Sequence, residues 1–395
     1  MSHEIFDELD QFNSQQGAVE MIDSLTKRLL ESKNYHQLFD ALLVKAKESM
    51  NLPLLQPTSL TDVPPELQDK FQEQYVQAAR TVGELFLEEQ NIPEAWIYLR
   101  TIQEPEKVRA AIEAIPIPHE SNEQSDQILE VALYEGAHPT KGFEWLLRTH
   151  GICNTVTAFE QSSQQMNNED RRTVAKLLVN EIYNNLINGI QYSIEQRMAI
   201  TTTSKDSLAT LIAERDWLFE EGNYHVDVSH LNSIVRFAKF LQPDDTELPK
   251  AVELAEYGSH LEGDLQFPGE TPFDDFYPAH RYYFMALLDD KRDEAINYFQ
   301  QKLNDEPITE EKPTIAYVLV DLLLQCNLPD KALEVAKEHL QNSDNSVGIT
   351  FADVCRETNN LAALGDYARQ QNDPITYAAT LIQQQKQIAE TNDPS

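Results

Sequence analysis

The chain has 395 residues and carries 31 Lys and Arg against 66 Asp and Glu, which gives a formal charge of −35. Only 12 of the 395 residues are glycine, about 3 % against a typical ~7 %. Nucleotide-binding βαβ sheets and β-sandwiches need more glycine for their phosphate loops and tight turns. The negative charge repels polyanions, so we expect no nucleic-acid partner.

The sequence contains no apparent targeting or membrane segment. Its first ten residues are acidic, unlike a secretory signal, and no apolar run approaches the ~18 residues that would span a bilayer. The three cysteines, Cys153, Cys326 and Cys355, are few and far apart, which is not typical of a disulfide framework. We therefore expect a cytoplasmic protein with no membrane partner.

Apolar residues between 18 and 50 recur at helical intervals and are interrupted once, by a polar break at 32–34. This spacing predicts two antiparallel helices, which follow an N-terminal arm at 1–17. Four prolines then fall between 51 and 65, and this density excludes one continuous helix there.

A second helical hairpin is predicted around a turn at Pro93, which suits the first turn of a helix. Gly83, Phe86 and Ala95 stand at the spacing of the small, aromatic and small signature positions of a tetratricopeptide repeat. Leu99, four residues after Ala95, nearly keeps the aromatic position that comes next. The Trp and Leu-Gly positions of the repeat are mostly absent.

The same half-pattern returns near the C-terminus at Ala295, Ala332 and Ala363, which are 37 and 31 residues apart and so bracket the repeat's period of about 34. The chain thus resembles a degenerate tetratricopeptide-like (TPR-like) α-solenoid. The resemblance implies an all-α fold in which antiparallel helical hairpins are stacked. We expect such hairpins at 18–114 and 281–385, before a flexible tail at 386–395.

The middle section, 115–280, departs from the repeat. Eight of the twelve glycines and six of the ten histidines lie within 136–280. The segment 267–278 mixes aromatic residues with turn formers, so we expect an ordered loop packed by its own side chains. Apolar spacing still predicts helices at 129–137, 143–148, 171–200, 207–221, 230–241 and 250–260.

Histidines and carboxylates of this middle section form the best candidate site. Asp227 and His230 are three residues apart, and His260 and Asp264 are four apart, spacings that share one helix face. Imidazole and carboxylate groups are ligands for zinc, iron or manganese. The predicted metal ligands are His225, His230, His260 and Asp264, and the predicted catalytic groups are Tyr224, Asp227 and His280.

Two other interpretations of these residues stay open. One is an acid/base site without metal, in which Tyr224, His225 or His280 acts and Asp227 orients the imidazole. The other is structural: Asp227 caps the start of a helix, and His260 lies near a helix C-terminus, where positive charge suits the helix dipole.

A second group of polar residues has the types needed for a cysteine nucleophile, with His150, Cys153 and Asn154 close in sequence. The local sequence matches no thiol-protease signature. We favour a structural interpretation, in which Gly151 ends a helix in a left-handed conformation and Cys153 is a small apolar residue.

Two functions from different classes follow. The first is a TPR-like scaffold or adaptor that binds a protein or peptide on the concave face of its stacked hairpins, with basic partners favoured by the charge of −35. The second is an enzyme, metal-dependent or relying on histidine acid/base chemistry, that acts on a small molecule in a pocket built around His225, Asp227, His230, His260 and His280.

Overall fold

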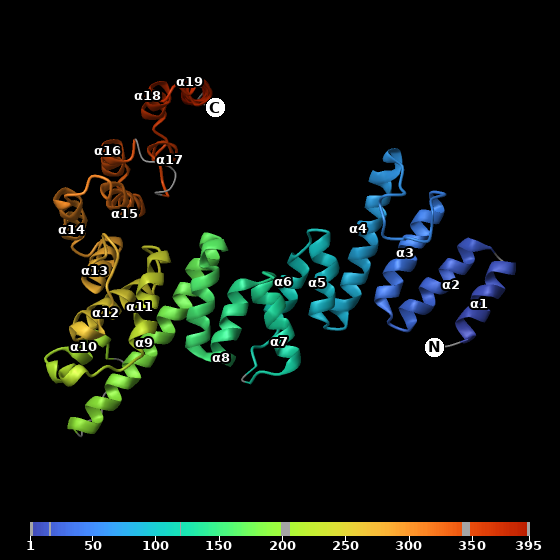
Figure 1. The fold of residues 1–395 in the computed structure, drawn as a ribbon, viewed down its shortest axis with the longest axis horizontal. Coiled ribbons are helices and arrows are strands. Elements are labelled where there is room, and N and C mark those ends of the chain that lie inside the picture. Colours follow the sequence, from blue (N-terminus) through green and yellow to red (C-terminus); the bar gives the residue numbers. More distant parts are fainter. Residues whose placement is uncertain (1–2, 16, 119, 199–205, 342–347, 393–395) are drawn as a thin grey trace. The chain divides into compact units, whose positions relative to one another are not determined.

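The computed structural model describes residues 3–15, 17–118, 120–198, 206–341 and 348–392, and none of these residues lies in a β-strand. Consecutive helices pack against one another (Figure 1), an arrangement consistent with a helical solenoid, so the predicted all-α fold class is confirmed. Contacts divide the chain into two compact units, 1–155 and 156–395. Among the described residues, no helix combines the length and the apolar character needed to cross a membrane.

The N-terminal unit is a succession of helices in which each packs on the next along the chain as far as α6. The expected arm at 1–17 contains a helix of its own. The helices are α1 (His3–Gln15), α2 (Ala18–Glu31), α3 (Tyr35–Ser49), α4 (Pro65–Glu88), α5 (Ile92–Thr101), α6 (Glu106–Ala114), α7 (Glu123–Leu129), a π-helical turn at Glu130–Tyr134, and α8 (Pro139–Ser162), within which the unit ends.

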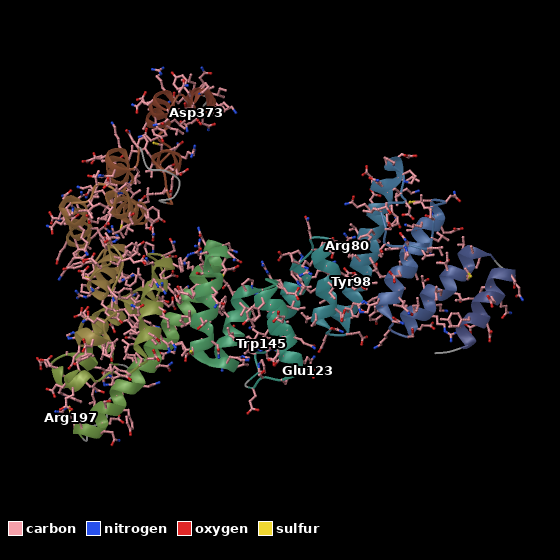
Figure 2. All side chains as sticks on the ribbon, viewed as in Figure 1. Arg80, Tyr98, Glu123, Trp145, Arg197 and Asp373 are labelled. Carbon is pink, nitrogen blue, oxygen red and sulfur yellow. The ribbon has the colours of Figure 1, made fainter. Side chains whose placement is uncertain are left out.

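The residues that carry the repeat resemblance pack the hairpin of α4 and α5. Gly83 and Ala95 are buried where the two helices approach closely. A Cβ atom on Gly83 would lie 2.7 Å from Cγ of Leu99, so a side chain at this position would push the helices apart. The ring of Phe86 stacks on that of Tyr98, with centroids 5.9 Å apart. Tyr98 is labelled on α5 in Figure 2.

One kind of turn joins helices repeatedly in both units. A residue with positive φ follows the first helix, and the next N–H donates to a carbonyl five residues back, which is the Schellman pattern. Glycine usually takes this left-handed position, but eight helix connections among the described residues place another residue there. They are Lys33, Asn51, Gln90, Gln103, Asp289, Asn327, Asn359 and Asn372, with φ between 53° and 60°.

The C-terminal unit begins with the last part of α8. A long helix follows, against which three shorter ones pack, and then paired helices. Its helices are α9 (Asn168–Met198), α10 (Leu208–Ile212), α11 (Val228–Phe237), α12 (Leu248–Ser259), α13 (Phe276–Leu287), α14 (Arg292–Asp305), α15 (Lys312–Gln325), α16 (Pro329–His339), α17 (Phe351–Glu357), α18 (Leu361–Gln370) and α19 (Pro374–Asn392).

One expectation for this unit differs from the structure. The helix predicted over 207–221 ends at Ile212 and is followed by short 3₁₀ turns, because the backbone has positive φ at Glu214 and Glu221. The tail expected from residue 386 is helical as far as Asn392, while 393–395 lie outside the described residues. The end of the helix predicted over 171–200 also lies outside them, beyond Met198.

A buried ionic network fixes α9 against the segment that leads into α12. The carboxylate of Asp245 accepts hydrogen bonds from Arg172 Nε at 2.8 Å, Arg172 Nη2 at 2.9 Å and the Gln242 backbone N–H at 2.8 Å, and Lys176 Nζ lies 3.0 Å away. Burial disfavours this charge, but the donors outweigh it and hold the pKa of Asp245 at about 2. The network therefore needs an ionised Asp245.

The aromatic loop at 267–278 is ordered, as its sequence predicts. Phe273 is buried and stacks on His280, with ring centroids 4.3 Å apart, and its ring edge meets Phe299 of α14. Phe276 and Tyr277 pack edge to face at the start of α13. The loop thus joins the core through its own rings and closes one side of α13.

Candidate functional site

His225, a predicted metal ligand, is bound to a tyrosine of α12. Its Nδ1 and its backbone N–H both lie 3.0 Å from the hydroxyl of Tyr257. Burial lowers the pKa of His225, and its Nε2 is buried without a hydrogen-bond partner. Tyr224, the neighbouring residue predicted to be catalytic, is 52 % exposed.

Asp227 caps the N-terminus of α11. Its Oδ1 accepts hydrogen bonds from the backbone N–H groups of Ser229 at 2.9 Å and His230 at 3.3 Å, and from the Ser229 hydroxyl at 2.5 Å. The bond from Ser229 holds the pKa of Asp227 below its ordinary value. This is the structural role that the sequence left open, and it directs the carboxylate toward the backbone of its own helix.

His260 and Asp264 do not meet on one helix face. His260 follows the end of α12, where its ring stacks on Phe219 with centroids 5.0 Å apart and its Nε2 lies 3.6 Å from Glu256. Asp264 lies in a separate 3₁₀ turn at Gly263–Leu265. Within the described ranges, no three His, Cys, Asp or Glu side chains are grouped so that they could hold a metal ion. The structure gives the predicted metal site no support.

His280 is buried on α13 between aromatic rings. Its Nδ1 lies 2.7 Å from the carbonyl oxygen of Phe276, to which it donates, and the rings of Phe273 and Phe276 are each 4.3 Å away between centroids. Burial lowers the pKa of His280 to about 3, so the imidazole is neutral near pH 7. Its Nε2 is buried and has no hydrogen-bond partner.

The second group of polar residues has local partners. His150 Nδ1 lies 2.7 Å from the Thr149 hydroxyl, and the Asn154 amide donates to the His150 carbonyl. Gly151 breaks α8 with φ 80° and ψ 175°, so the predicted helix break at this glycine is confirmed, and the chain resumes its helix beyond it. Cys153 is exposed.

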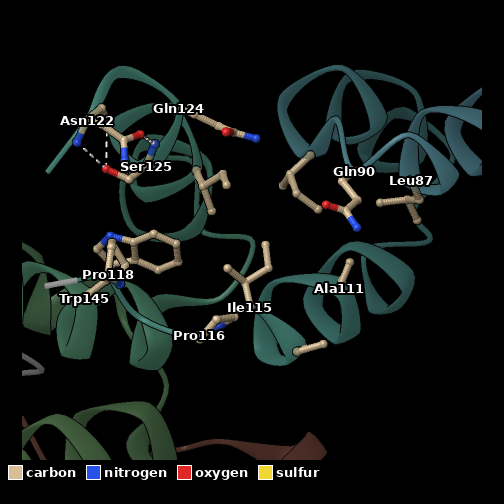
Figure 3. Close-up of a pocket in the computed structure, with 13 residues that line it drawn as sticks. Leu87, Gln90, Ala111, Ile115, Pro116, Pro118, Asn122, Gln124, Ser125 and Trp145 are labelled. Carbon is tan, nitrogen blue, oxygen red and sulfur yellow. Dashed lines mark hydrogen bonds between the residues drawn. The ribbon is translucent and has the colours of Figure 1, made fainter. Parts of the chain in front are cut away.

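The N-terminal unit contains a pocket that the sequence did not indicate (Figure 3). Its volume is about 460 Å³, and it lies between the α4–α5 turn, the end of α6, the segment that follows α6, and α7. We call it the apolar pocket. It is lined by Leu87, Gln90, Ile92, Ala111, Ala114, Ile115, Pro116, Pro118, Asn122, Gln124, Ser125, Ile128 and Trp145.

The lining of the apolar pocket contains no charged side chain, although a quarter of the chain's residues are charged. The side chains of Trp145 on α8 and Ile92 on α5 are buried and form part of the pocket wall. Gln90 and Gln124 are exposed and lie on opposite sides of the pocket in Figure 3. Asn122 accepts a bond from the Ser125 N–H at 2.9 Å and so caps α7. The pocket thus offers apolar contact inside and amide groups at its opening.

Sequence reasoning missed this pocket because its lining is spread over nearly sixty residues of chain. The local signal was the run 115–118, in which isoleucine and proline alternate. Prolines that follow a helix prevent its continuation, so α6 ends at Ala114, and Ile115 has an extended backbone.

Comparisons with known proteins add no relative: no family model matches the chain, and no curated protein or solved structure is detectably similar to it.

Proposed function

We propose that this chain is a TPR-like helical scaffold that binds a segment of a partner protein, and that the apolar pocket is the anchor point for that segment. One observation carries the proposal: a pocket of about 460 Å³ without any charged lining group, in a chain of net charge −35. Such a volume falls in the range of ~300–1,000 Å³ typical of ligand pockets.

The helix pairing supports the repeat interpretation. Ala95, Ala295 and Ala332 are fully buried, on α5, α14 and α16. Each lies on the second helix of a packed pair, where a small residue lets the helices approach closely. Ala363 of α18 is only partly buried, so the pattern is weaker there. Stacked helix pairs present extended surfaces that suit extended or helical segments of other proteins.

The chemistry of the apolar pocket favours an apolar side chain of the partner. Burying such a side chain contributes roughly 1.5–3 kcal/mol. The exposed amides of Gln90 and Gln124 can each donate and accept, which matches the hydrogen-bonding needs of a peptide backbone. Basic residues beside the apolar anchor would be attracted by the acidic surface, an effect that salt weakens.

The test is a peptide selection on the full chain. Peptides enriched from a random display library are synthesised and their Kd is measured by fluorescence anisotropy. We expect them to share a large apolar residue and to bind an Ala114→Arg variant at least tenfold more weakly. Ala114 is exposed at the end of α6, so an arginine there is tolerated by the fold but reaches the pocket.

The matched control is Ala362→Arg, which makes the same substitution at an exposed helical alanine of the C-terminal unit. It should leave the Kd unchanged. Selection of no common apolar residue, or equal binding by the Ala114→Arg variant and the wild type, would refute the apolar pocket as the anchor.

A further inference from the structure

A second pocket, of about 490 Å³, lies within the C-terminal unit and differs in character from the apolar pocket. We call it the cationic pocket. Side chains of α9, α13, α15 and α17, together with the stretch before and the loop after α12, contribute to its lining. Among them are two basic groups, Arg171 and Lys239, and several aromatic rings.

Lys239 is a partly buried ammonium group with no carboxylate partner. Its Nζ lies 4.6 Å from the ring centroid of Phe273, and no ion pair joins it to an acid in the described part of the chain. Burial lowers the pKa of Lys239 and repulsion from Arg236 adds to this, while attraction to Asp321 and Glu270 opposes it. A cation so placed is stabilised by the ring but has lost part of its hydration, so an added anion would stabilise it further.

Arg171 of α9 is in a similar position. Its guanidinium lies 5.1 Å from the ring centroid of Phe240, and its one hydrogen bond among the described residues goes to the Asn168 side chain. The Nε of Arg171 is buried and has no hydrogen-bond partner. Buried donors without a partner are rare, because each forfeits its bonds to water.

The two acidic side chains that line the cationic pocket are either hydrogen-bonded within the protein or exposed to solvent. Asp321 accepts hydrogen bonds from the Tyr283 hydroxyl at 3.0 Å and the Gln325 amide at 2.7 Å. Burial raises the pKa of Asp321, while its hydrogen bonds from Tyr283 and Gln325 and the nearby charge of Lys239 oppose this rise. Glu357 is exposed. Neither Lys239 nor Arg171 therefore forms an ion pair with an acid among the described residues, and Arg171 Nε stays without a hydrogen-bond partner.

We propose that the cationic pocket binds a small organic anion, with Lys239 and Arg171 receiving its carboxylate or phosphate group and the surrounding rings contacting its apolar part. Two cations in one pocket favour an anionic ligand over a cationic one, because they repel a positive charge and the rings of Phe240 and Phe273 already face them. A volume of about 490 Å³ has room for a metabolite-sized ligand.

The test uses four probes that share one aromatic ring: benzoate, phenyl phosphate, benzyl alcohol and benzylamine. Binding to the full chain is measured by isothermal titration calorimetry and by ligand-observed NMR. We expect at least one anion to bind with a Kd below ~1 mM, while the alcohol and the amine bind far more weakly. Benzoate and phenyl phosphate distinguish a carboxylate ligand from a phosphate ligand.

Two substitutions test the assigned groups. Lys239→Met and Arg171→Gln should each weaken anion binding about tenfold or more, as expected for loss of a charge-assisted hydrogen bond. Lys250→Met is the matched control: its Nζ lies 5.6 Å from the Tyr183 ring in the same unit but does not line the pocket, so binding should persist.

A variant that loses anion binding because it has unfolded would show a lower Tm than the wild type. Lys239→Met removes a charge from a partly buried position, so the Tm should stay the same or rise while binding is lost. Absence of anion binding, preference for benzylamine, or wild-type binding by both variants overturns the proposal. The Ala114→Arg variant should bind the anion normally, which separates this site from the apolar pocket.

Discussion

The close approach of α12 and α13 gives a sharp test of the packing that builds the C-terminal unit. Gly258 of α12 and Tyr277 of α13 are both buried. A Cβ atom at position 258 would lie 2.2 Å from Cδ1 and 2.3 Å from Cε1 of the Tyr277 ring. Favourable carbon contacts begin near ~3.5 Å, so a Gly258→Ala substitution forces the ring or the helix to move by more than an ångström.

The expected cost follows from two opposing effects. Alanine is favoured over glycine inside a helix by about 1 kcal/mol, whereas overpacking a closed core costs about 1–3 kcal/mol. Because the obstacle is a rigid ring without free space, we expect the upper end of that range and a net loss of about 2 kcal/mol. For a unit of this size, such a loss lowers the Tm by roughly 4–8 °C.

Gly365→Ala provides the control within the same unit. Gly365 is also a buried helical glycine, but the atom nearest to its added Cβ would be the Thr380 hydroxyl oxygen, at 3.2 Å. The gain in helix propensity is the same, so this variant should be unchanged or slightly more stable. The assay is thermal unfolding of the full chain by circular dichroism, with hydrogen exchange of the amides in α12 and α13. A Gly258→Ala variant that melts at or above the Gly365→Ala variant would refute the reasoning.

Three further predictions concern titration and reactivity. The pKa of Asp245 is about 2 in the folded chain against an ordinary 3.8. Its ionised form therefore contributes about 2 kcal/mol to stability above pH 4, and this contribution should disappear as the pH falls toward 2. In acid unfolding, an Asp245→Asn variant should lack it. His280 has a pKa of about 3 in the folded chain against an ordinary 6.5, so folding favours its neutral form. Below pH 6.5 the free energy of unfolding should therefore fall by up to about 1.4 kcal/mol per pH unit. A His280→Leu variant should lose this pH dependence, and an unchanged pH dependence would contradict the assignment. In a thiol titration of the native chain, the exposed Cys153 should react first. Cys326 and Cys355 should react slowly, because burial excludes the reagent and raises the pKa of each thiol, to about 11 for Cys355. Rapid reaction of all three thiols would contradict the packing.

The sequence predicted well those elements whose structure depends on local pattern. The hairpin of α4 and α5 was predicted from apolar residues at helical spacing on both sides of the turn at Pro93, and in the structure these spacings form the buried faces of the two helices. The stretch after Ile212 was predicted wrongly. Its apolar spacing fits a helix, yet Phe219 packs on Tyr257 and His260, rings that come forty residues later. These tertiary contacts are satisfied by 3₁₀ turns instead.

The functional residues were harder to predict for the same reason. The histidines drew attention by their chemistry, but Asp227 caps its own helix and His280 is enclosed by aromatic rings. Both pockets are assembled from segments far apart in sequence. Most of α9 and all of α10 and α11 lie between Arg171 and Lys239, and no periodicity indicates that these two residues line one cavity.

The turns that join the helices bear on how such a chain changes over evolutionary time. Each turn is closed by backbone hydrogen bonds, so its central residue needs only to adopt a left-handed conformation. Lysine, glutamine, asparagine and aspartate all do so here. A left-handed residue other than glycine costs up to about 1–2 kcal/mol, a cost that the packing of the adjoining helices offsets. Connections with so little dependence on side-chain identity let sequences diverge freely while the helix pairing persists. For a chain of this kind, we therefore expect the backbone geometry to be retained between relatives after the identity of most residues has changed.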